Sequence, residues 1–255
     1  FNVSLSEKIV KKEYPAARII NGTLVKITEV PYLVLIQIWK HKRPIFDCSG
    51  SLISNKHVLS AAHCFISDQG ELRTKALLHL GHNFRNTGTV RKSKTIFIHP
   101  DYSDLTNDIA LIIIKRVKFS ARIQPIALPS DLLDSYEGQT AIASGTGLTK
   151  DGDLFDYLFY GMTKPKIYSV ALLLISNDEC EQYFDDLVDS HVCSSAAFAG
   201  TCSGDSGGPL VLMKDGKPIL IGITSFGEIL CETNEPSVFT KVASFYDWIK
   251  SITEK

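Results

Sequence analysis

Three short segments of the sequence carry the side chains of a nucleophilic hydrolysis site. His63 follows the apolar pair Val58 and Leu59, Asp108 precedes the apolar run Ile109–Ile114, and Ser206 lies in a glycine-rich loop. Alone, such a histidine is usually a packed core residue, and such an aspartate usually caps a strand. A serine hydroxyl, however, is a poor nucleophile unless a base removes its proton and an acid orients that base. Flanking glycines let the backbone approach a substrate and direct N–H groups at a developing oxyanion. The three residues are therefore a candidate nucleophile, base and orienting acid.

The elements that must position these residues are predicted to be short strands. The stretches 32–39 and 109–114 are rich in β-branched and aromatic residues, and turn clusters such as Ser54-Asn55-Lys56 separate the runs. This pattern predicts an all-β sandwich or barrel fold instead of alternating strands and helices. A seam is expected near 121–139, where prolines and a glycine interrupt the apolar pattern. One helix is predicted at the C-terminus, since Phe245, Trp248, Ile249 and Ile252 stand at i, i+3, i+4 and i+7.

Composition limits the possible partners. The 255 residues are 44% hydrophobic and 22% charged, and 27 Lys and Arg nearly balance 28 Asp and Glu, giving a net charge of −1. A near-neutral surface disfavours nucleic acid and anionic membrane as main partners. The longest apolar runs, such as 31–38, are too short to cross a bilayer. We therefore expect a soluble globular protein with no membrane or nucleic-acid partner.

The six cysteines predict disulfides. They allow 15 pairings, which the residues alone do not resolve. Neither Cys-x-x-Cys nor His-Glu-x-x-His occurs, so a zinc site lacks its usual spacing, and structural disulfides in an oxidising compartment are the better interpretation. Glycosylation sequons at Asn2 and Asn21 agree with export. Since Phe1-Asn2-Val3-Ser4 does not begin a signal segment, we expect that a signal has already been removed.

Taken together, the three segments resemble the chymotrypsin-type serine proteases. Gly204-Asp205-Ser206-Gly207-Gly208-Pro209 and Ala61-Ala62-His63-Cys64 carry the resemblance, in the family's order His, Asp, Ser, and it extends from Ile19 to the C-terminal helix. It implies two antiparallel six-stranded Greek-key β-barrels with the active site between them, one at roughly 30–122 and one at roughly 135–240, and a helix at 243–254. It also implies a secreted digestive endopeptidase that needs no cofactor, with peptide or protein substrates and protein protease inhibitors as possible partners.

The resemblance assigns roles by position. Ser206 attacks the peptide carbonyl, His63 moves the proton, Asp108 holds the imidazole tautomer, and the N–H groups of Gly204 and Ser206 form the oxyanion hole. Further positions are implied to bind the substrate, through the pocket or through an edge that pairs with the substrate backbone: Gly200, Thr201, Ser203, Ser225, Phe226, Gly227 and Ser237.

The N-terminal segment resembles an activation propeptide. Residues 1–18 are polar and basic, and Pro15-Ala16-Ala17-Arg18 followed by Ile19 resembles the family's activation junction. Cleavage after Arg18 by a trypsin-like protease would expose the Ile19 ammonium, which would pair with Asp205 and set the oxyanion loop. The protease domain is then 19–255. Asn21 replaces the family's usual glycine.

The family pattern also implies the disulfides Cys48–Cys64, Cys180–Cys193 and Cys202–Cys231, the sparse set of invertebrate digestive members. At the start of the family's calcium loop this chain has His82 where some relatives carry glutamate, so no metal site is expected.

The pocket predicts an apolar specificity. Gly200 stands at the pocket floor, where trypsin-like members carry Asp, and Ser237 replaces a usual glycine and should shorten the pocket. A neutral slot fits Phe, Tyr, Leu or Met before the scissile bond. Glu228 near the entrance could instead favour basic residues elsewhere in the substrate, although a solvated charge is the simpler interpretation. An alternative function is a non-catalytic protease homologue that binds or regulates partners; Thr146, where the family usually has tryptophan, keeps it open. A regulatory cascade protease is disfavoured by the short N-terminal segment, which contains no cysteine.

Overall fold

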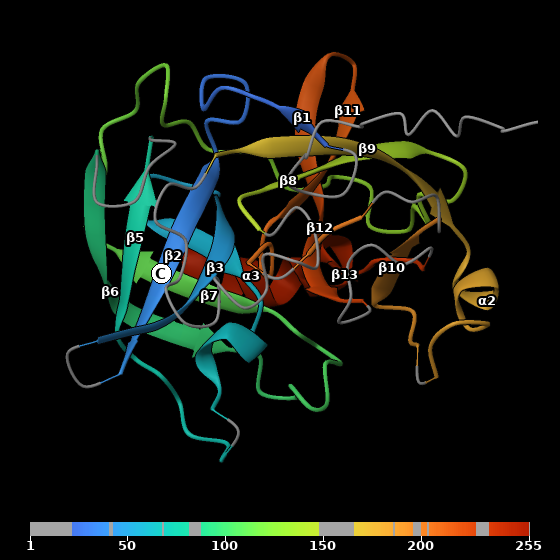
Figure 1. The fold of residues 1–255 in the computed structure, drawn as a ribbon, viewed down its shortest axis with the longest axis horizontal. Coiled ribbons are helices and arrows are strands. Elements are labelled where there is room, and N and C mark those ends of the chain that lie inside the picture. Colours follow the sequence, from blue (N-terminus) through green and yellow to red (C-terminus); the bar gives the residue numbers. More distant parts are fainter. Residues whose placement is uncertain are drawn as a thin grey trace, which may run out of the picture.

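The protein folds into two antiparallel β-barrels. The computed structural model describes residues 22–40, 43–67, 69–81, 88–147, 166–185, 187–195, 200–202, 204–227 and 235–254. Figure 1 shows the strands of the first barrel on one side of the view and those of the second on the other. The predicted all-β architecture of two six-stranded barrels is confirmed.

The first barrel is a closed ring of six strands in the order β2-β3-β4-β7-β6-β5. Branched aliphatic side chains of β2, including Val34, Ile36 and Ile38, are almost completely buried and pack with Ile112 in its core. Such residues fit a pleated, buried surface, which is why the stretch forms a strand. Its strands are β2 (Leu33–Lys40), β3 (Arg43–Leu52), β4 (His57–Ser60), β5 (Ala76–Leu80), β6 (Thr89–Ile98) and β7 (Ala110–Ile114).

The second barrel closes through pairing of its first two strands. Its order is β9-β10-β13-β12-β11-β8, β8 pairs again with β9, and the short β1 adds to the outer side of β9. Its own core contains Ala143, Leu172, Leu210 and Phe239. The strands are β1 (Thr23–Leu24), β8 (Thr140–Gly145), β9 (Tyr168–Ile175), β10 (His191–Ser194), β11 (Pro209–Lys214), β12 (Lys217–Phe226) and β13 (Val238–Lys241).

The C-terminal helix is shorter than predicted. The region 243–254 divides into the 3-10 turn η3 (Val242–Phe245) and the α-helix α3 (Tyr246–Thr253). The predicted apolar stripe still packs inward, with Phe245 and Ile249 buried against the first barrel's core. The other short helices are η1 (His63–Phe65) and α2 (Asn177–Cys180). Among the described residues, no helix is long and apolar enough to cross a membrane.

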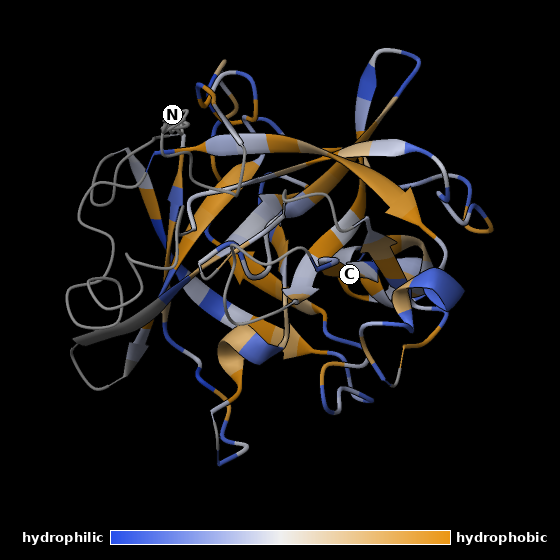
Figure 2. Ribbon diagram, turned by 45° about the vertical axis from the view of Figure 1, so that its right-hand side comes forward, coloured by the Kyte–Doolittle hydropathy of each residue, from blue (hydrophilic) through white to orange (hydrophobic). Residues whose placement is uncertain are grey.

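The two barrels meet along a seam that holds the candidate site. Residues 115–139 link β7 to β8, and among them Ile126 donates its N–H to the Leu52 carbonyl while Ala127 forms a parallel bridge with Ile219. Hydrophobic colour in Figure 2 is concentrated on the strands, and hydrophilic colour on turns and on α2. The apolar strands therefore form the barrel cores, and the polar site residues lie in η1 and in the loops that precede β7 and β11.

Candidate active site

His63 and Asp108 form a tightly held pair at the edge of the first barrel. The imidazole Nδ1 lies 2.7 Å from Asp108 Oδ2, and the backbone N–H of His63 donates to Oδ1 at 2.9 Å. Because the carboxylate accepts at Nδ1, that nitrogen carries the proton and Nε2 keeps a free lone pair. Burial favours the neutral imidazole, yet the charge of Asp108 and its hydrogen bond prevail and raise the pKa of His63 above its ordinary value. The histidine is thus poised as a base at Nε2.

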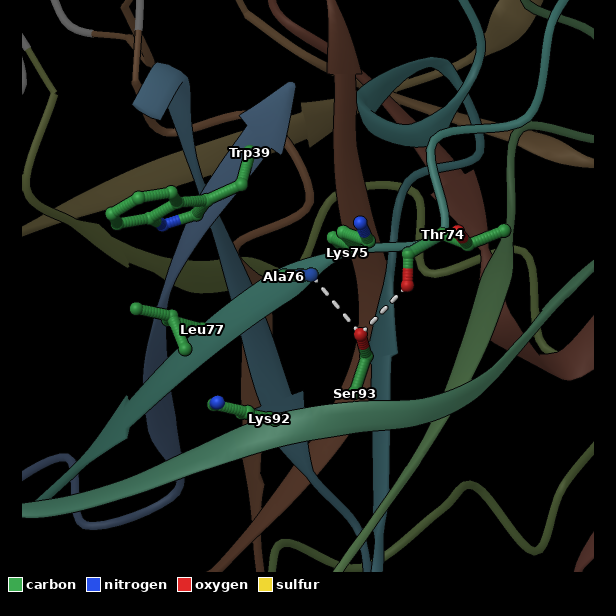
Figure 3. Close-up of a pocket in the computed structure, with 7 residues that line it drawn as sticks. All are labelled: Trp39, Thr74, Lys75, Ala76, Leu77, Lys92 and Ser93. Carbon is green, nitrogen blue, oxygen red and sulfur yellow. Dashed lines mark hydrogen bonds between the residues drawn. The ribbon is translucent and has the colours of Figure 1, made fainter. Parts of the chain in front are cut away.

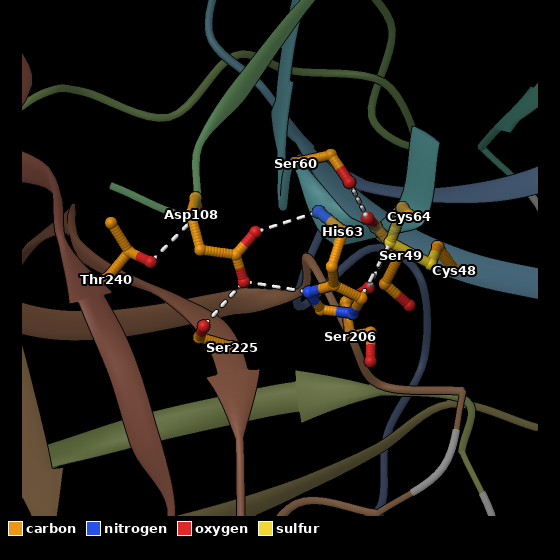
Figure 4. A network of polar contacts seen from close by, with 9 residues as sticks. All are labelled: Cys48, Ser49, Ser60, His63, Cys64, Asp108, Ser206, Ser225 and Thr240. Carbon is orange, nitrogen blue, oxygen red and sulfur yellow. Dashed lines mark hydrogen bonds and ion pairs between the residues drawn. A yellow bond between two sulfur atoms is a disulfide. The ribbon is translucent and has the colours of Figure 1, made fainter. Parts of the chain in front are cut away.

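Asp108 is a buried carboxylate that accepts hydrogen bonds at both of its oxygens. It is 0% exposed, and Ser225 Oγ donates to Oδ2 at 2.5 Å. Thr240 Oγ1 donates to the main-chain oxygen of Asp108 at 2.9 Å (Figure 4). Burial opposes the charge, but His63, the Ser225 hydroxyl and the His63 backbone together lower the pKa of Asp108 below its ordinary value. The group is therefore an anion that orients the histidine.

Ser206 reaches this pair from the second barrel. Its main-chain oxygen accepts the N–H of Ser49 at 2.8 Å, and Figure 4 places the serine beside the imidazole, on the side away from Asp108. The next residue must be glycine: Gly207 has φ +78°, and a Cβ there would lie 2.2 Å from Ser60 Oγ. The tight turn at Gly207 thus fixes Ser206 against the first barrel.

The disulfide Cys48–Cys64 lies within the first barrel, beside the main chain of Ser206. Cys64 follows His63, Cys48 precedes Ser49, and Cys64 Sγ lies 3.8 Å from the main-chain oxygen of Ser206. The predicted bond Cys180–Cys193 is also present. Cys202 is disulfide-bonded as well, and its predicted partner Cys231 lies outside the described residues.

Asp205, next to the serine, is a second buried carboxylate. It is 1% exposed and accepts the N–H of Gly147 at 2.7 Å and of Cys202 at 3.0 Å. Side chains at positions 145 and 147 would collide with it, because a Cβ on Gly145 or Gly147 would lie 2.0 or 2.5 Å from its oxygens. Burial raises the pKa of Asp205 to about 7, against the lowering effect of these backbone donors. Across the described ranges, no ion pair to Asp205 is present.

The predicted pocket floor is assembled from two loops. Ser237 Oγ accepts the N–H of Thr201 at 3.1 Å and lies 3.2 Å from its hydroxyl, and a Cβ on Gly200 would lie 2.9 Å from it. Gly200 and Ser237 therefore face each other closely, with no formal charge on either. Ser225, Phe226 and Gly227 follow one another at the end of β12, and the Phe226 ring meets Phe184 edge-on at 5.6 Å.

Several predicted residues lie outside the described residues. This group contains Arg18 and Ile19 of the activation junction, Ser203, Glu228 and the sequon asparagines Asn2 and Asn21. One metal-like cluster is formed by Cys48, His63 and Cys64, whose ligand-type atoms lie within 4.8 Å of one another. Its two sulfurs are joined in a disulfide and do not supply the thiolates that zinc binds.

Comparison with known proteins agrees with this geometry. A family model described as Trypsin matches residues 19–249. The chain belongs to the trypsin family. It is 33% identical to a chymotrypsin of Phaedon cochleariae over 94% of this chain and 84% of that protein, and 34% identical to a collagenase of Hypoderma lineatum over 94% and 89%. A solved structure titled HL collagenase, at 1.7 Å resolution, superposes with a TM-score of 0.80 at 32% identity and covers 93% of this chain and 99% of that one. The chain is a chymotrypsin-like serine endopeptidase.

Sequence reasoning missed three parts of this protease's site. The Ser225 hydroxyl was assigned only to substrate binding, although it also bonds to Asp108, and Thr240 and Ser49 were not singled out at all. Each of these residues lies more than 100 positions along the chain from the residue that it contacts. The one available signal is the type of residue, a small hydroxyl side chain within a strand, which can donate a hydrogen bond where the strand is buried.

Proposed function

We propose that this protease is made as an extracellular zymogen, is activated by cleavage after Arg18, and cuts peptide bonds after large apolar residues by an acyl-enzyme mechanism. The observation that carries the proposal is the His63–Asp108 pair, 2.7 Å apart, with Ser206 beside the imidazole. A digestive role is part of the proposal, and its support is the sparse disulfide pattern. Export is supported by the disulfides, which persist in oxidising compartments.

The chemistry follows from the tautomer of His63. Ser206 Oγ attacks the carbonyl carbon while its proton passes to His63 Nε2, and the negative charge that forms on the carbonyl oxygen meets the N–H groups of Gly204 and Ser206. The imidazolium is stabilised by Asp108, which stays ionised. The same proton then goes to the leaving amine and the C–N bond breaks. Water, deprotonated in turn by His63, releases the acyl group from Ser206.

Activation is supported by the state of Asp205. A buried carboxylate with a pKa of about 7 is an unfavourable anion at neutral pH. The α-ammonium of Ile19, freed by cleavage, is a cation of suitable size to pair with it. Since Asp205 directly precedes Ser206 and also binds the backbone at Gly147, its pairing would fix the loop that carries the oxyanion donors.

Specificity is supported by the composition of the pocket floor. A positive substrate side chain would need a carboxylate there, and the facing residues are Gly200 and Ser237. The Ser237 hydroxyl is held by Thr201 and narrows the floor, which favours Leu, Met, Phe or Tyr without strong selection among them.

A serine-directed phosphonate tests the proposal. After trypsin treatment the chain should acquire a single adduct on Ser206, and the uncleaved chain should react far more slowly. Ser206→Ala, which should fold normally and show no turnover, is the matched control. If the cleaved wild-type chain forms no adduct at Ser206, the non-catalytic homologue becomes the correct interpretation. Profiling the cleaved enzyme on a peptide library measures the specificity, and a preference for Arg or Lys before the scissile bond would contradict the pocket assignment.

A further inference from the structure

The outer surface of the first barrel contains a hollow that the proposed mechanism does not use. It has a volume of about 450 Å³ and lies where β2, β5 and β6 run side by side (Figure 3). Its apolar wall includes the half-buried Trp39 and Leu77. A recess of this volume beside an indole ring is large enough to receive a side chain of a ligand.

The hollow is held open by the strands that form it. The pairing register shifts between Ile38 and Trp39 on β2 and between Ser93 and Thr95 on β6, and such bulges re-aim neighbouring side chains. Ser93 Oγ accepts the N–H of Ala76 at 3.0 Å and donates to the Thr74 carbonyl at 2.9 Å, as Figure 3 shows. This serine therefore ties β6 to the start of β5 at the base of the hollow.

The tryptophan is fixed in the same way. The indole N–H of Trp39 donates to Gln37 Oε1 at 3.1 Å, and its backbone N–H donates to the Lys75 carbonyl at 2.9 Å. Gln37 is itself buried. The ring is thus oriented before any ligand binds, which lowers the entropy cost of binding.

The charge of the lining is one-sided. Lys75 and Lys92 are exposed lining residues, and among the described residues that line the hollow there is no carboxylate. Lys94, two residues along β6 from Lys92, is also exposed. A chain whose net charge is −1 therefore has a local excess of cations at this one recess.

We propose that this hollow binds an acidic peptide segment, with an apolar side chain between Trp39 and Leu77 and flanking carboxylates on Lys75 and Lys92. The proposal rests on the proposed protease function, because the segment belongs to a protein substrate. Strand β3 links the two sites: Pro44 pairs with Trp39, and Ser49 holds the main chain of Ser206. Five residues of strand span roughly 17 Å, so an extended substrate reaches the hollow about five or more residues beyond the scissile bond.

Binding is tested in a chain that does not cut the probe. The chain has two tryptophans, so in a Ser206→Ala, Trp248→Phe background Trp39 alone reports on the hollow by its fluorescence. The peptide Glu-Glu-Phe-Glu-Glu should give a saturable change that weakens with added salt. The peptides Gln-Gln-Phe-Gln-Gln and Glu-Glu-Ala-Glu-Glu should bind at least several-fold more weakly, since each lacks one of the two required features.

Charge reversal locates the contact. Lys75→Glu with Lys92→Glu should weaken binding of the acidic peptide by at least about tenfold, because two attractions become repulsions. The matched control is Lys214→Glu with Lys217→Glu, the same charge change on the exposed β11–β12 turn, which should alter binding less than about twofold. No saturation, equal binding of the glutamine peptide, or equal loss in both double variants overturns the site.

Recruitment is tested separately in the active enzyme. A substrate with an acidic apolar segment six residues after the scissile bond should have a lower KM than its glutamine counterpart, with kcat unchanged. The Lys75 and Lys92 double variant should lose this difference while it cuts a short substrate at the wild-type rate. Normal cutting of the short substrate shows that the proposed function holds even where recruitment fails. An unchanged KM difference in the double variant overturns recruitment.

Discussion

Two buried aspartates, one from each barrel, have opposite electrostatic properties. Asp108 of the first barrel faces His63 and the Ser225 hydroxyl, and its pKa is lowered. Among the described residues, the hydrogen bonds to the Asp205 carboxylate of the second barrel come from backbone N–H groups. Its pKa is raised to about 7. Both are almost fully removed from water.

The difference is whether a buried carboxylate has a partner that can carry a positive charge. Asp108 has a partner that becomes cationic during the reaction, so its charge is stabilised in the folded chain. Asp205 is desolvated, and no cation lies beside it among the described residues. This is the state that we expect of the carboxylate before the proposed activation. The catalytic pair is therefore complete in the folded chain, whereas under the proposed activation the oxyanion loop would gain its cationic partner only after cleavage.

The largest effect is expected from Asp108→Asn. The amide cannot hold the Nδ1 proton in the required tautomer, so the catalytic rate of the cleaved enzyme should fall by about 10⁴-fold. Steady-state kinetics on a short chromogenic substrate measures this. A rate within tenfold of wild type would contradict the role assigned to Asp108.

A smaller loss is expected from Asp205→Asn. In the cleaved enzyme, loss of the pairing with Ile19 should misplace the oxyanion donors and lower kcat about 10²- to 10³-fold. In the intact chain the same change should stabilise the fold near pH 8, by on the order of 3 kcal/mol, as urea unfolding would show.

The sign of that stability change follows from linkage. The pKa of Asp205 is raised from 3.8 to about 7, so the folded chain holds the proton more tightly than the unfolded chain. The stability that the protonated group contributes is fully present below about pH 4 and is lost as pH rises through about 7. Asparagine should remove this loss. Asp108→Asn should lower the free energy of unfolding instead, because the lowered pKa of Asp108 means that its anion is the favoured form in the folded chain. If both variants changed the free energy of unfolding in the same direction, the contrast between the two aspartates would be wrong.

On the acidic side of its pH profile, the kcat/KM of the cleaved enzyme should increase tenfold per pH unit. His63 must be neutral at Nε2 to accept a proton, and Asp108 raises the pKa of His63 above the ordinary 6.5. The kcat/KM of the cleaved enzyme should therefore rise tenfold per pH unit up to a midpoint above 6.5. In Asp108→Asn the residual activity should have a midpoint at lower pH, and an unmoved midpoint would separate the histidine from the aspartate.

The smallest effect is expected from Ser225→Ala. Loss of one hydroxyl donor should raise the pKa of Asp108 and slow the catalytic rate severalfold. Thr240→Val is the matched control, since its hydroxyl bonds to the main chain of Asp108 and not to the carboxylate. The two variants should differ in kcat although both lose one buried hydrogen bond.

The sequence predicts the catalytic residues more completely than it predicts the residues that hold them in place. His63, Asp108 and Ser206 lie in short local motifs, and a motif can be read without knowing the fold. The barrels follow from the strand pattern and the family resemblance together. The contacts of Ser225, Thr240 and Ser49 could not be predicted, because each depends on tertiary pairing between distant segments. The hollow beside Trp39 was missed for the same reason: bulges in two strands create it, and neither has a clear signature in the residues.

The Cys48–Cys64 bond makes the active site dependent on redox conditions. It joins the strand that holds the Ser206 main chain to the turn that carries His63, so nucleophile and base share one covalent brace. A thiol reductant that opens this bond would remove the covalent limit on the distance between them. Opening the bond should therefore slow the cleaved enzyme and also lower its free energy of unfolding, by on the order of 3 kcal/mol, because the bond joins positions 16 apart in the sequence.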